Sequence, residues 1–228
     1  MSNGYTVREC FYSLQGEGAR AGTANVFLRF AGCNLACSVA LEGFNCDTDF
    51  SFGGKLALDA VIRLVRRIDM GDCKKIILTG GEPMLQVDEA LLVALHGAGY
   101  YVAVETNGTK RVPSSVDVGA KGVDYIACSP KPGSEVALVR ADEVRCVVQT
   151  GQEPDHRGVV ASAYFVSPAF VAPGDVPAAR ASRKWVGSAD DADSLAIDWA
   201  VSVCKRQVGW GEIRWRLSVQ QHKFWGVE

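Results

Sequence analysis

Three cysteines lie close together in one stretch of the chain, with the spacing Cys33-x3-Cys37-x8-Cys46. Cysteine thiolates are the usual ligands of iron–sulfur clusters, and a 4Fe-4S cluster normally takes one thiolate per iron. Three local thiolates would therefore leave one iron with an open coordination position, which a bidentate amino acid could fill. Structural zinc is the alternative interpretation of the same triad, although zinc prefers four ligands and no fourth His or Cys lies nearby.

Polar and glycine residues follow three apolar runs of the sequence. These segments are Thr79-Gly80-Gly81-Glu82, Glu105-Thr106-Asn107-Gly108 and Ser129-Pro130-Lys131. In α/β folds built on parallel strands, the carboxyl ends of the strands carry the site. Any one of these segments could be only a turn, but three in the same position relative to a strand predict a shared site.

The elements that would position these residues alternate between strands and helices. Short runs of branched and aromatic residues predict strands, and apolar residues at helical spacing predict helices. The predicted strands are 25–30, 75–79, 101–105, 125–128, 144–148, 163–166 and 213–219, and the predicted helices are 56–68, 88–96 and 190–207. This alternation favours an α/β fold, in which a parallel sheet with crossover helices forms a barrel or part of one. No stretch has the composition of a linker, so we expect a single domain over residues 1–228.

The composition limits the classes of partner and compartment. A formal net charge of −2 gives no bulk attraction to nucleic acid, and no apolar run approaches the length needed to cross a bilayer. Eight cysteines in 228 residues are too sparse for a disulfide-built scaffold. We therefore expect a cytoplasmic protein with no nucleic-acid or membrane partner, in which clustered cysteines act as ligands.

The cysteine loop resembles that of a known superfamily. Cys33-Asn34-Leu35-Ala36-Cys37, followed by Cys46-Asp47-Thr48, is similar to the cluster loop of radical S-adenosylmethionine enzymes. The usual form of that loop is C-x3-C-x2-C, and here an insertion over 39–44 lengthens the second gap of a loop spanning 32–48. Thr79-Gly80-Gly81-Glu82-Pro83 resembles the general element of the same superfamily.

Two further segments resemble one family within it, the 7-carboxy-7-deazaguanine synthases. Residues 11–18 are similar to that family's opening signature, and residues 217–223 to its C-terminal strand and tail. The resemblance runs nearly from end to end and implies a shortened, TIM-like radical S-adenosylmethionine barrel that forms a homodimer. It implies a lyase that converts 6-carboxy-5,6,7,8-tetrahydropterin to 7-carboxy-7-deazaguanine with release of ammonia, in 7-deazapurine (queuosine-type) biosynthesis.

The resemblance also implies cofactors and their ligands. Cys33, Cys37 and Cys46 would hold the 4Fe-4S cluster, Thr48 would bind Mg2+ with Asp47 as a weaker candidate, and flavodoxin or ferredoxin would supply electrons. The S-adenosylmethionine ligands implied are Gly80, Gly81, Glu82, Asn107, Ser129 and Lys131. The implied pterin contacts are Gln15, Gly16, Glu17, Arg29, Glu105, Thr106 and His222. No protein side chain is expected to be catalytic, because the cofactor supplies the radical.

Some roles stay open at the level of sequence. Arg29 lies within an apolar strand, where it could be a surface residue or a bidentate partner of the substrate carboxylate. Two other functions compete with the synthase. A glycyl-radical-activating enzyme would share the cluster loop and the Thr79–Pro83 element, and a zinc-stabilised binding protein would share only the cysteines.

Overall fold

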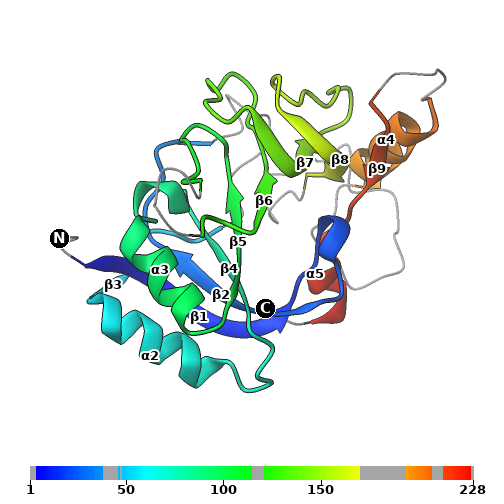
Figure 1. The fold of residues 1–228 in the computed structure, drawn as a ribbon. Helices are drawn as coiled ribbons and strands as arrows, with labels where there is room; N and C mark the ends of the chain where they lie inside the picture. The colour runs from blue at the N-terminus through cyan, green and yellow to red at the C-terminus, as the bar shows by residue number, and fades with distance from the viewer. Residues whose placement is uncertain are drawn as a thin grey trace.

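A computed structural model describes residues 4–37, 46, 48–114, 121–169, 194–206 and 213–226 of the chain. Its centre is one mixed sheet with the strand order β3-β1-β2-β4-β5-β6-β7-β8-β9, with no pairing between its two edge strands (Figure 1). The strands are β1 (Tyr5–Leu14), β2 (Ala24–Phe30), β3 (Gly54–Leu56), β4 (Lys75–Gly80), β5 (Tyr101–Thr106), β6 (Tyr125–Cys128), β7 (Arg140–Val148), β8 (Val160–Pro168) and β9 (Trp215–Leu217). The helices are α2 (Leu58–Ile68), α3 (Glu89–Gly97), α4 (Ser194–Lys205) and α5 (Gln221–Trp225), with short 3-10 turns η1 (Gly18–Arg20) and η2 (Pro83–Leu85).

From β2 to β9 every neighbouring pair of strands is parallel, whereas β1 pairs antiparallel with both β2 and β3. The predicted parallel sheet is thus confirmed, with an antiparallel edge added to it. Because the sheet curves without closing, it forms the partial barrel expected from the sequence.

The seven predicted strands and three predicted helices are all present, most with ends shifted by a few residues, while positions 190–193 and 207 of the last predicted helix lie outside the described residues. α3 begins where the sequence indicates, since the Asp88 side chain accepts a hydrogen bond of 3.0 Å from the Leu91 amide and caps the helix. Three elements were not predicted: β1, β3 and α5. The prediction of crossover helices holds only in part, because the connections at 129–139 and 149–159 contain turns and no helix.

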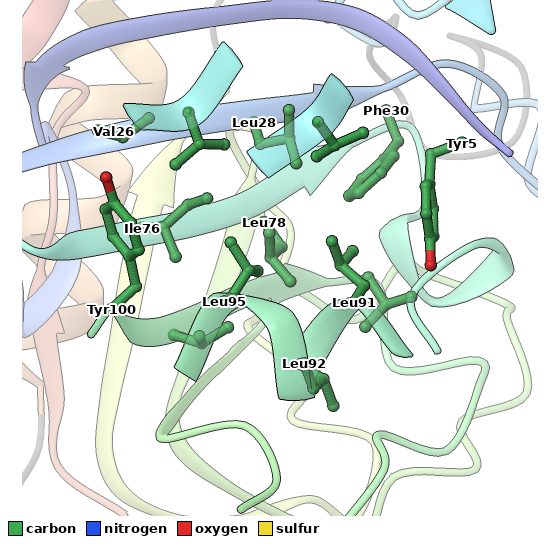
Figure 2. Packing of buried hydrophobic residues seen from close by; sticks show 14 of the residues in the cluster. Tyr5, Val26, Leu28, Phe30, Ile76, Leu78, Leu91, Leu92, Leu95 and Tyr100 are labelled. Carbon is green, nitrogen blue, oxygen red and sulfur yellow. The ribbon is translucent and has the colours of Figure 1, made fainter. Parts of the chain in front are cut away.

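The main hydrophobic core lies between the sheet and the helices α2 and α3. Alternate residues of β2 and β4, such as Val26, Leu28 and Ile76, face Leu91 and Leu95 of α3 (Figure 2). Their neighbours Phe27 and Ile77 face the opposite side of the sheet, where they pack with Ala103 and Tyr125. This alternation follows from the two-residue period of a strand and gives the sheet an outer, helix-covered face and an inner face.

The end of the sheet formed by β8 and β9 is covered by a different helix, α4. α4 packs Ala200 and Val203 against Val148 and Val166, next to β8 and β9 (Figure 1). No helix in the described ranges is long and apolar enough to cross a membrane.

Candidate active site

Two cavities open where the parallel strands end, on the inner side of the sheet. The first cavity is lined by Glu17, Cys37, Cys46, Thr48, Thr79, Gly80, Gly81, Glu105, Thr106, Asn107, Ser129, Lys131, Val147, Ser167, Pro168 and Gln220. The ends of β4, β5 and β6 therefore meet at one site, as the three polar segments of the sequence predicted. Because loops after strands can vary without disturbing the sheet, such an edge is a rigid frame for chemistry.

Two of the three clustered cysteines line this first cavity. Cys37 and Cys46 form part of its wall, while the Sγ of Cys33 lies 4.0 Å from the side-chain nitrogen Nδ2 of Asn107. Burial raises the pKa of the Cys33 thiol, and the charges of Glu82 and Cys46 act in the same direction. All three thiols are free of disulfides.

The donor set suits an iron–sulfur cluster, since three thiols come from one loop and two of them face a common cavity. Within the described part of the chain, no three His, Cys, Asp or Glu side chains already converge on one point. The 39–44 insertion and Asp47, the weaker magnesium candidate, lie outside the described residues.

The two glycines after β4 pack against the start of the cysteine loop. A Cβ on Gly81 would lie 2.2 Å from the Gly32 carbonyl oxygen and 2.8 Å from the Cβ of Cys33. Gly80 has a φ of +138°, and a Cβ there would lie 2.2 Å from the Phe30 carbonyl oxygen. Glycine is required at both positions, because a Cβ at Gly80 would clash with Phe30 of β2 and a Cβ at Gly81 with Gly32 and Cys33 of the cysteine loop.

Glu82 ties the end of β4 to the end of β5. It is fully buried, and its carboxylate accepts hydrogen bonds from the Thr106 hydroxyl at 2.8 Å, the Asn107 amide at 2.8 Å and the Met84 amide at 3.0 Å. Burial raises the pKa of this carboxyl, although the three hydrogen bonds oppose the rise. Glu82 lies behind the cavity wall rather than in it, unlike Gly80 and Gly81.

The remaining predicted cofactor ligands lie together in the first cavity. Lys131 donates a hydrogen bond of 2.8 Å to the Ser129 hydroxyl, and both residues line the wall with Asn107. An ammonium and two small polar groups at one end of a cavity suit a ligand with an amino-acid carboxylate. The cavity also carries Thr106, which was predicted to contact the pterin.

The second cavity adjoins the first. It is lined by Arg8, Glu9, Phe11, Leu14, Gln15, Gly16, Glu17, Phe27, Arg29, Thr48, Asp49, Thr79, Glu105, Arg145, Gln220 and His222. Six of the seven predicted pterin contacts are therefore brought together here, from the loop after β1, from β2 and β5, and from the C-terminal segment. Its volume of about 370 Å³ is within the range of small-molecule sites. Glu17, Thr48, Thr79, Glu105 and Gln220 line both cavities, so the two spaces share a wall.

The opening and closing segments of the chain meet at this second cavity. The Gln221 amide donates a hydrogen bond of 3.0 Å to the Gly16 carbonyl oxygen. A Cβ on Gly16 would lie 2.0 Å from Nδ1 of His222, so only glycine lets α5 approach this closely. Figure 1 shows the red C-terminal helix α5 beside the blue N-terminal segment. This contact explains why both segments are needed for one site.

Arg29 is a partner of Glu9 on the neighbouring strand β1. Its Nε donates a hydrogen bond of 2.6 Å to the Glu9 carboxylate, and its guanidinium lies 5.8 Å from the centre of the Phe11 ring. The Arg29 side chain is 22% exposed and lines the second cavity. Arg29 therefore pairs with the Glu9 carboxylate and borders the second cavity, while its pairing with a substrate carboxylate stays a prediction.

A buried ionic network underlies the second cavity. Arg145 of β7 bonds the Glu105 carboxylate at 2.8 Å, pairs with Glu143, and lies 3.8 Å from the Glu17 carboxylate. Burial alone would raise the pKa of Glu105, yet Arg145, Gln15 and Thr79 hold it below its ordinary value. Sequence reasoning missed Arg145, although an arginine inside the apolar run 144–148 was a detectable signal.

Comparisons with known proteins agree with this geometry. Residues 14–106 match the model of the family described as a 4Fe-4S single cluster domain. The 7-carboxy-7-deazaguanine synthase of Bradyrhizobium diazoefficiens is 37% identical over 98% of this chain and 99% of that protein. The synthase of Bacteroides thetaiotaomicron is 45% identical over 64% of this chain and 71% of that protein.

The fold is also that of a solved protein. The crystal structure of QueE from Escherichia coli matches with a TM-score of 0.62 and 22% identity, over 96% of this chain and 95% of that one. At that identity the likeness concerns the fold alone. The 37% identity over nearly the full length of a synthase, together with Cys37 and Cys46 in the wall of the first cavity, establishes that this chain belongs to the 7-carboxy-7-deazaguanine synthase family of radical S-adenosylmethionine lyases.

Proposed function

We propose that this protein converts 6-carboxy-5,6,7,8-tetrahydropterin to 7-carboxy-7-deazaguanine, releasing ammonia, in 7-deazapurine (queuosine-type) biosynthesis. The observation that carries the proposal is the pair of adjoining cavities. One has the thiols and small polar groups of a cluster and cofactor site, and the other has carboxylates, an amide and arginines suited to a carboxylated heterocycle. Turnover of the carboxytetrahydropterin by the cluster-loaded enzyme tests the proposal.

The first cavity would hold the cluster and the cofactor. Cys33, Cys37 and Cys46 would bind three irons, and S-adenosylmethionine on the fourth would supply a 5′-deoxyadenosyl radical when reduced. Ser129 and Lys131 would hold the methionyl carboxylate, because a lysine ammonium 2.8 Å from a serine hydroxyl offers adjacent donors. The Gly80–Gly81 backbone would border the methionyl amine, and Glu82 would keep that backbone in place through Thr106 and Asn107.

The second cavity would hold the pterin. Glu17 and Glu105 are acceptors for the ring N–H and amino groups, and Gln15 is fixed between them, since it donates a 2.9 Å bond to Glu105 and accepts a 3.0 Å bond from the Glu17 amide. Arg29 and His222, which also line this cavity, would border the substrate as well. These residues bind and orient the substrate at the shared wall, which lies next to the cofactor cavity.

Arg29→Ala is expected to weaken binding of the carboxytetrahydropterin and to leave S-adenosylmethionine binding unchanged. Arg29 lines only the second cavity, and a lost charged hydrogen bond costs about 1.5–3 kcal/mol, or roughly 10- to 100-fold in affinity. Affinities of both ligands should be measured by calorimetry. Arg63→Ala, which breaks an exposed pair with Asp59 far from both cavities, is the control. Equal weakening of both ligands by Arg29→Ala would mark it as structural.

We also propose that Thr48 binds Mg2+ between the two ligands. Thr48 lines both cavities, and magnesium keeps several waters while sharing few protein oxygens with its substrate. Its hydroxyl, the substrate carboxylate and a ring oxygen would then complete the site, with the ion orienting the carboxylate.

Thr48→Val is expected to remove the stimulation of turnover by magnesium while the cluster absorption stays intact, because valine keeps the shape of threonine but has no oxygen ligand. Initial rates over a magnesium titration measure this. Thr48→Ser, which restores a hydroxyl, should recover the stimulation. Undiminished magnesium dependence in Thr48→Val would refute the assignment.

The electron donor and the assembly are further parts of the proposal. Flavodoxin or ferredoxin would deliver the electron, and the protein would act as a homodimer. Turnover driven by reduced flavodoxin in place of a chemical reductant tests the first statement. Analytical ultracentrifugation tests the second, and a monomer at working concentrations would contradict it.

A further inference from the structure

Arg145 occupies the middle of β7 and has only 6% of its surface exposed. It forms ion pairs with Glu143 on its own strand and with Glu105 at the end of β5. Glu143 is fully buried and is fixed further by the Ala19 amide at 2.8 Å and the Tyr125 hydroxyl at 3.0 Å. The Arg145 guanidinium is therefore held by Glu143 through Nε and Nη2, while its Nη1 donates to Glu105 in the cavity wall.

The positive charge of Arg145 offsets the repulsion between two carboxylates at the second cavity. Glu17 and Glu105 both line it and are only partly exposed, and two neighbouring carboxylates favour uptake of a proton by one of them. Arg145 lies 2.8 Å from Glu105 and 3.8 Å from Glu17, so its charge acts on both. The pKa of Glu105 is lowered despite burial, with Arg145 as the largest opposing cause.

The hydrogen bonds of Glu105 leave it an acceptor for a ligand. Its Oε1 accepts from Gln15 at 2.9 Å and from Arg145 at 2.8 Å, and its Oε2 accepts from the Thr79 hydroxyl at 3.0 Å. A carboxylate has about four acceptor positions, so one position on Oε2 is available in a residue that borders both cavities.

We propose that Arg145 is a positioning residue for substrate recognition: bridging Glu143 and Glu105, it holds the Glu105 carboxylate ionised and fixed in orientation, so that Oε2 accepts a ring N–H of the bound pterin. This inference rests on the proposed function, since it names how that substrate is recognised. Arg145 is itself part of the wall of the second cavity, and the role assigned to it here is exerted through Glu105. Arg145 contributes by holding the Glu105 carboxylate in its binding orientation before the substrate arrives, so that less free energy is lost in ordering this side chain on binding.

The first test is Arg145→Lys, which keeps the charge but loses the planar fork that reaches two carboxylates at once. The KM for the carboxytetrahydropterin should rise roughly 10- to 100-fold, as for loss of one charged hydrogen bond, with a much smaller change in kcat. Cluster absorption and cleavage of S-adenosylmethionine without substrate should stay at the wild-type level. Arg140→Lys, an exposed position on the same strand, is the matched control and should leave KM unchanged.

A second variant keeps the proposal testable if Arg145→Lys does not fold. Arg145→Met combined with Glu143→Gln removes both charges of the deepest pair, and such replacements of buried pairs are often tolerated. The glutamine carbonyl would still accept from Ala19 and Tyr125, while Glu105 would lose its cation. The account expects this double variant to fold and to show the same rise in KM.

Two results would overturn the proposal. One is a KM within twofold of wild type in both variants. The other is a rise in KM accompanied in both variants by loss of the cluster and of unfolding stability, which would mark Arg145 as structural. Absence of turnover in wild type and Arg140→Lys would instead contradict the proposed function.

Discussion

Replacing Cys37 with alanine is expected to abolish the iron–sulfur absorption of the anaerobically prepared protein and its reductive cleavage of S-adenosylmethionine. Cys37 and Cys46 line the same cavity, and Cys33 lies four residues before Cys37 in the same stretch of the chain. Only three thiolates are available locally for four irons, so loss of one uncovers a second iron. Cys33→Ala and Cys46→Ala should behave in the same way, which visible absorption and iron analysis would measure.

Cysteines outside the loop provide the controls. Cys73 and Cys204 are partly exposed and lie outside both cavities, so serine at either should leave the cluster and cofactor cleavage intact. A full complement of four irons and four sulfides in the Cys37→Ala protein would show that another residue is the second ligand.

Glu82→Ala is expected to lower the free energy of unfolding by roughly 3–5 kcal/mol and to abolish measurable S-adenosylmethionine binding. The carboxylate accepts from Thr106, Asn107 and Met84 in a fully buried position, and each buried donor left unsatisfied costs about 1–3 kcal/mol. Without it, the ends of β4 and β5 lose the link that sets the Gly80–Gly81 backbone against the cysteine loop. Urea unfolding and calorimetric titration of the cofactor would measure the two effects.

Glu82→Gln separates the loss of packing from the loss of the carboxylate. The glutamine carbonyl can still accept from Thr106 and Met84, but its amide would face the Asn107 N–H, so an intermediate loss of stability is expected. Glu89→Gln, at an exposed position in the first turn of α3, should change stability by no more than about 0.5 kcal/mol. Normal stability and cofactor affinity in Glu82→Ala would contradict the role assigned to this residue.

Local patterns were sufficient to predict the parallel part of the sheet and the cavity at its carboxyl edge. The runs 75–79, 101–105 and 125–128 are apolar because β4, β5 and β6 are covered by protein, and the polar residues after them had to lie on one edge. β1 was missed because Arg8 and Glu9 interrupt its apolar pattern, where the register also shifts between Val7 and Glu9.

Other features depend on contacts between distant parts of the chain. The approach of His222 to Gly16 joins residues 206 positions apart in the sequence, which no local pattern encodes. The location of Glu82 behind the wall follows from one local hydrogen bond, from the Met84 amide, and from two bonds from Thr106 and Asn107, which only the folded sheet brings close. Arg145 could have been suspected from its apolar neighbours, but its partners Glu105 and Glu143 could be identified only once β5 and β7 were placed on either side of β6.

One measurement tests the central claim most directly. The anaerobically reconstituted protein is mixed with S-adenosylmethionine, magnesium, a reductant and 6-carboxy-5,6,7,8-tetrahydropterin, and the products are followed by liquid chromatography with mass detection. The account predicts 7-carboxy-7-deazaguanine and ammonia in equal amounts, with product absent when the Cys37→Ala protein is used. Cleavage of S-adenosylmethionine by the wild-type protein with the pterin left unchanged would contradict it.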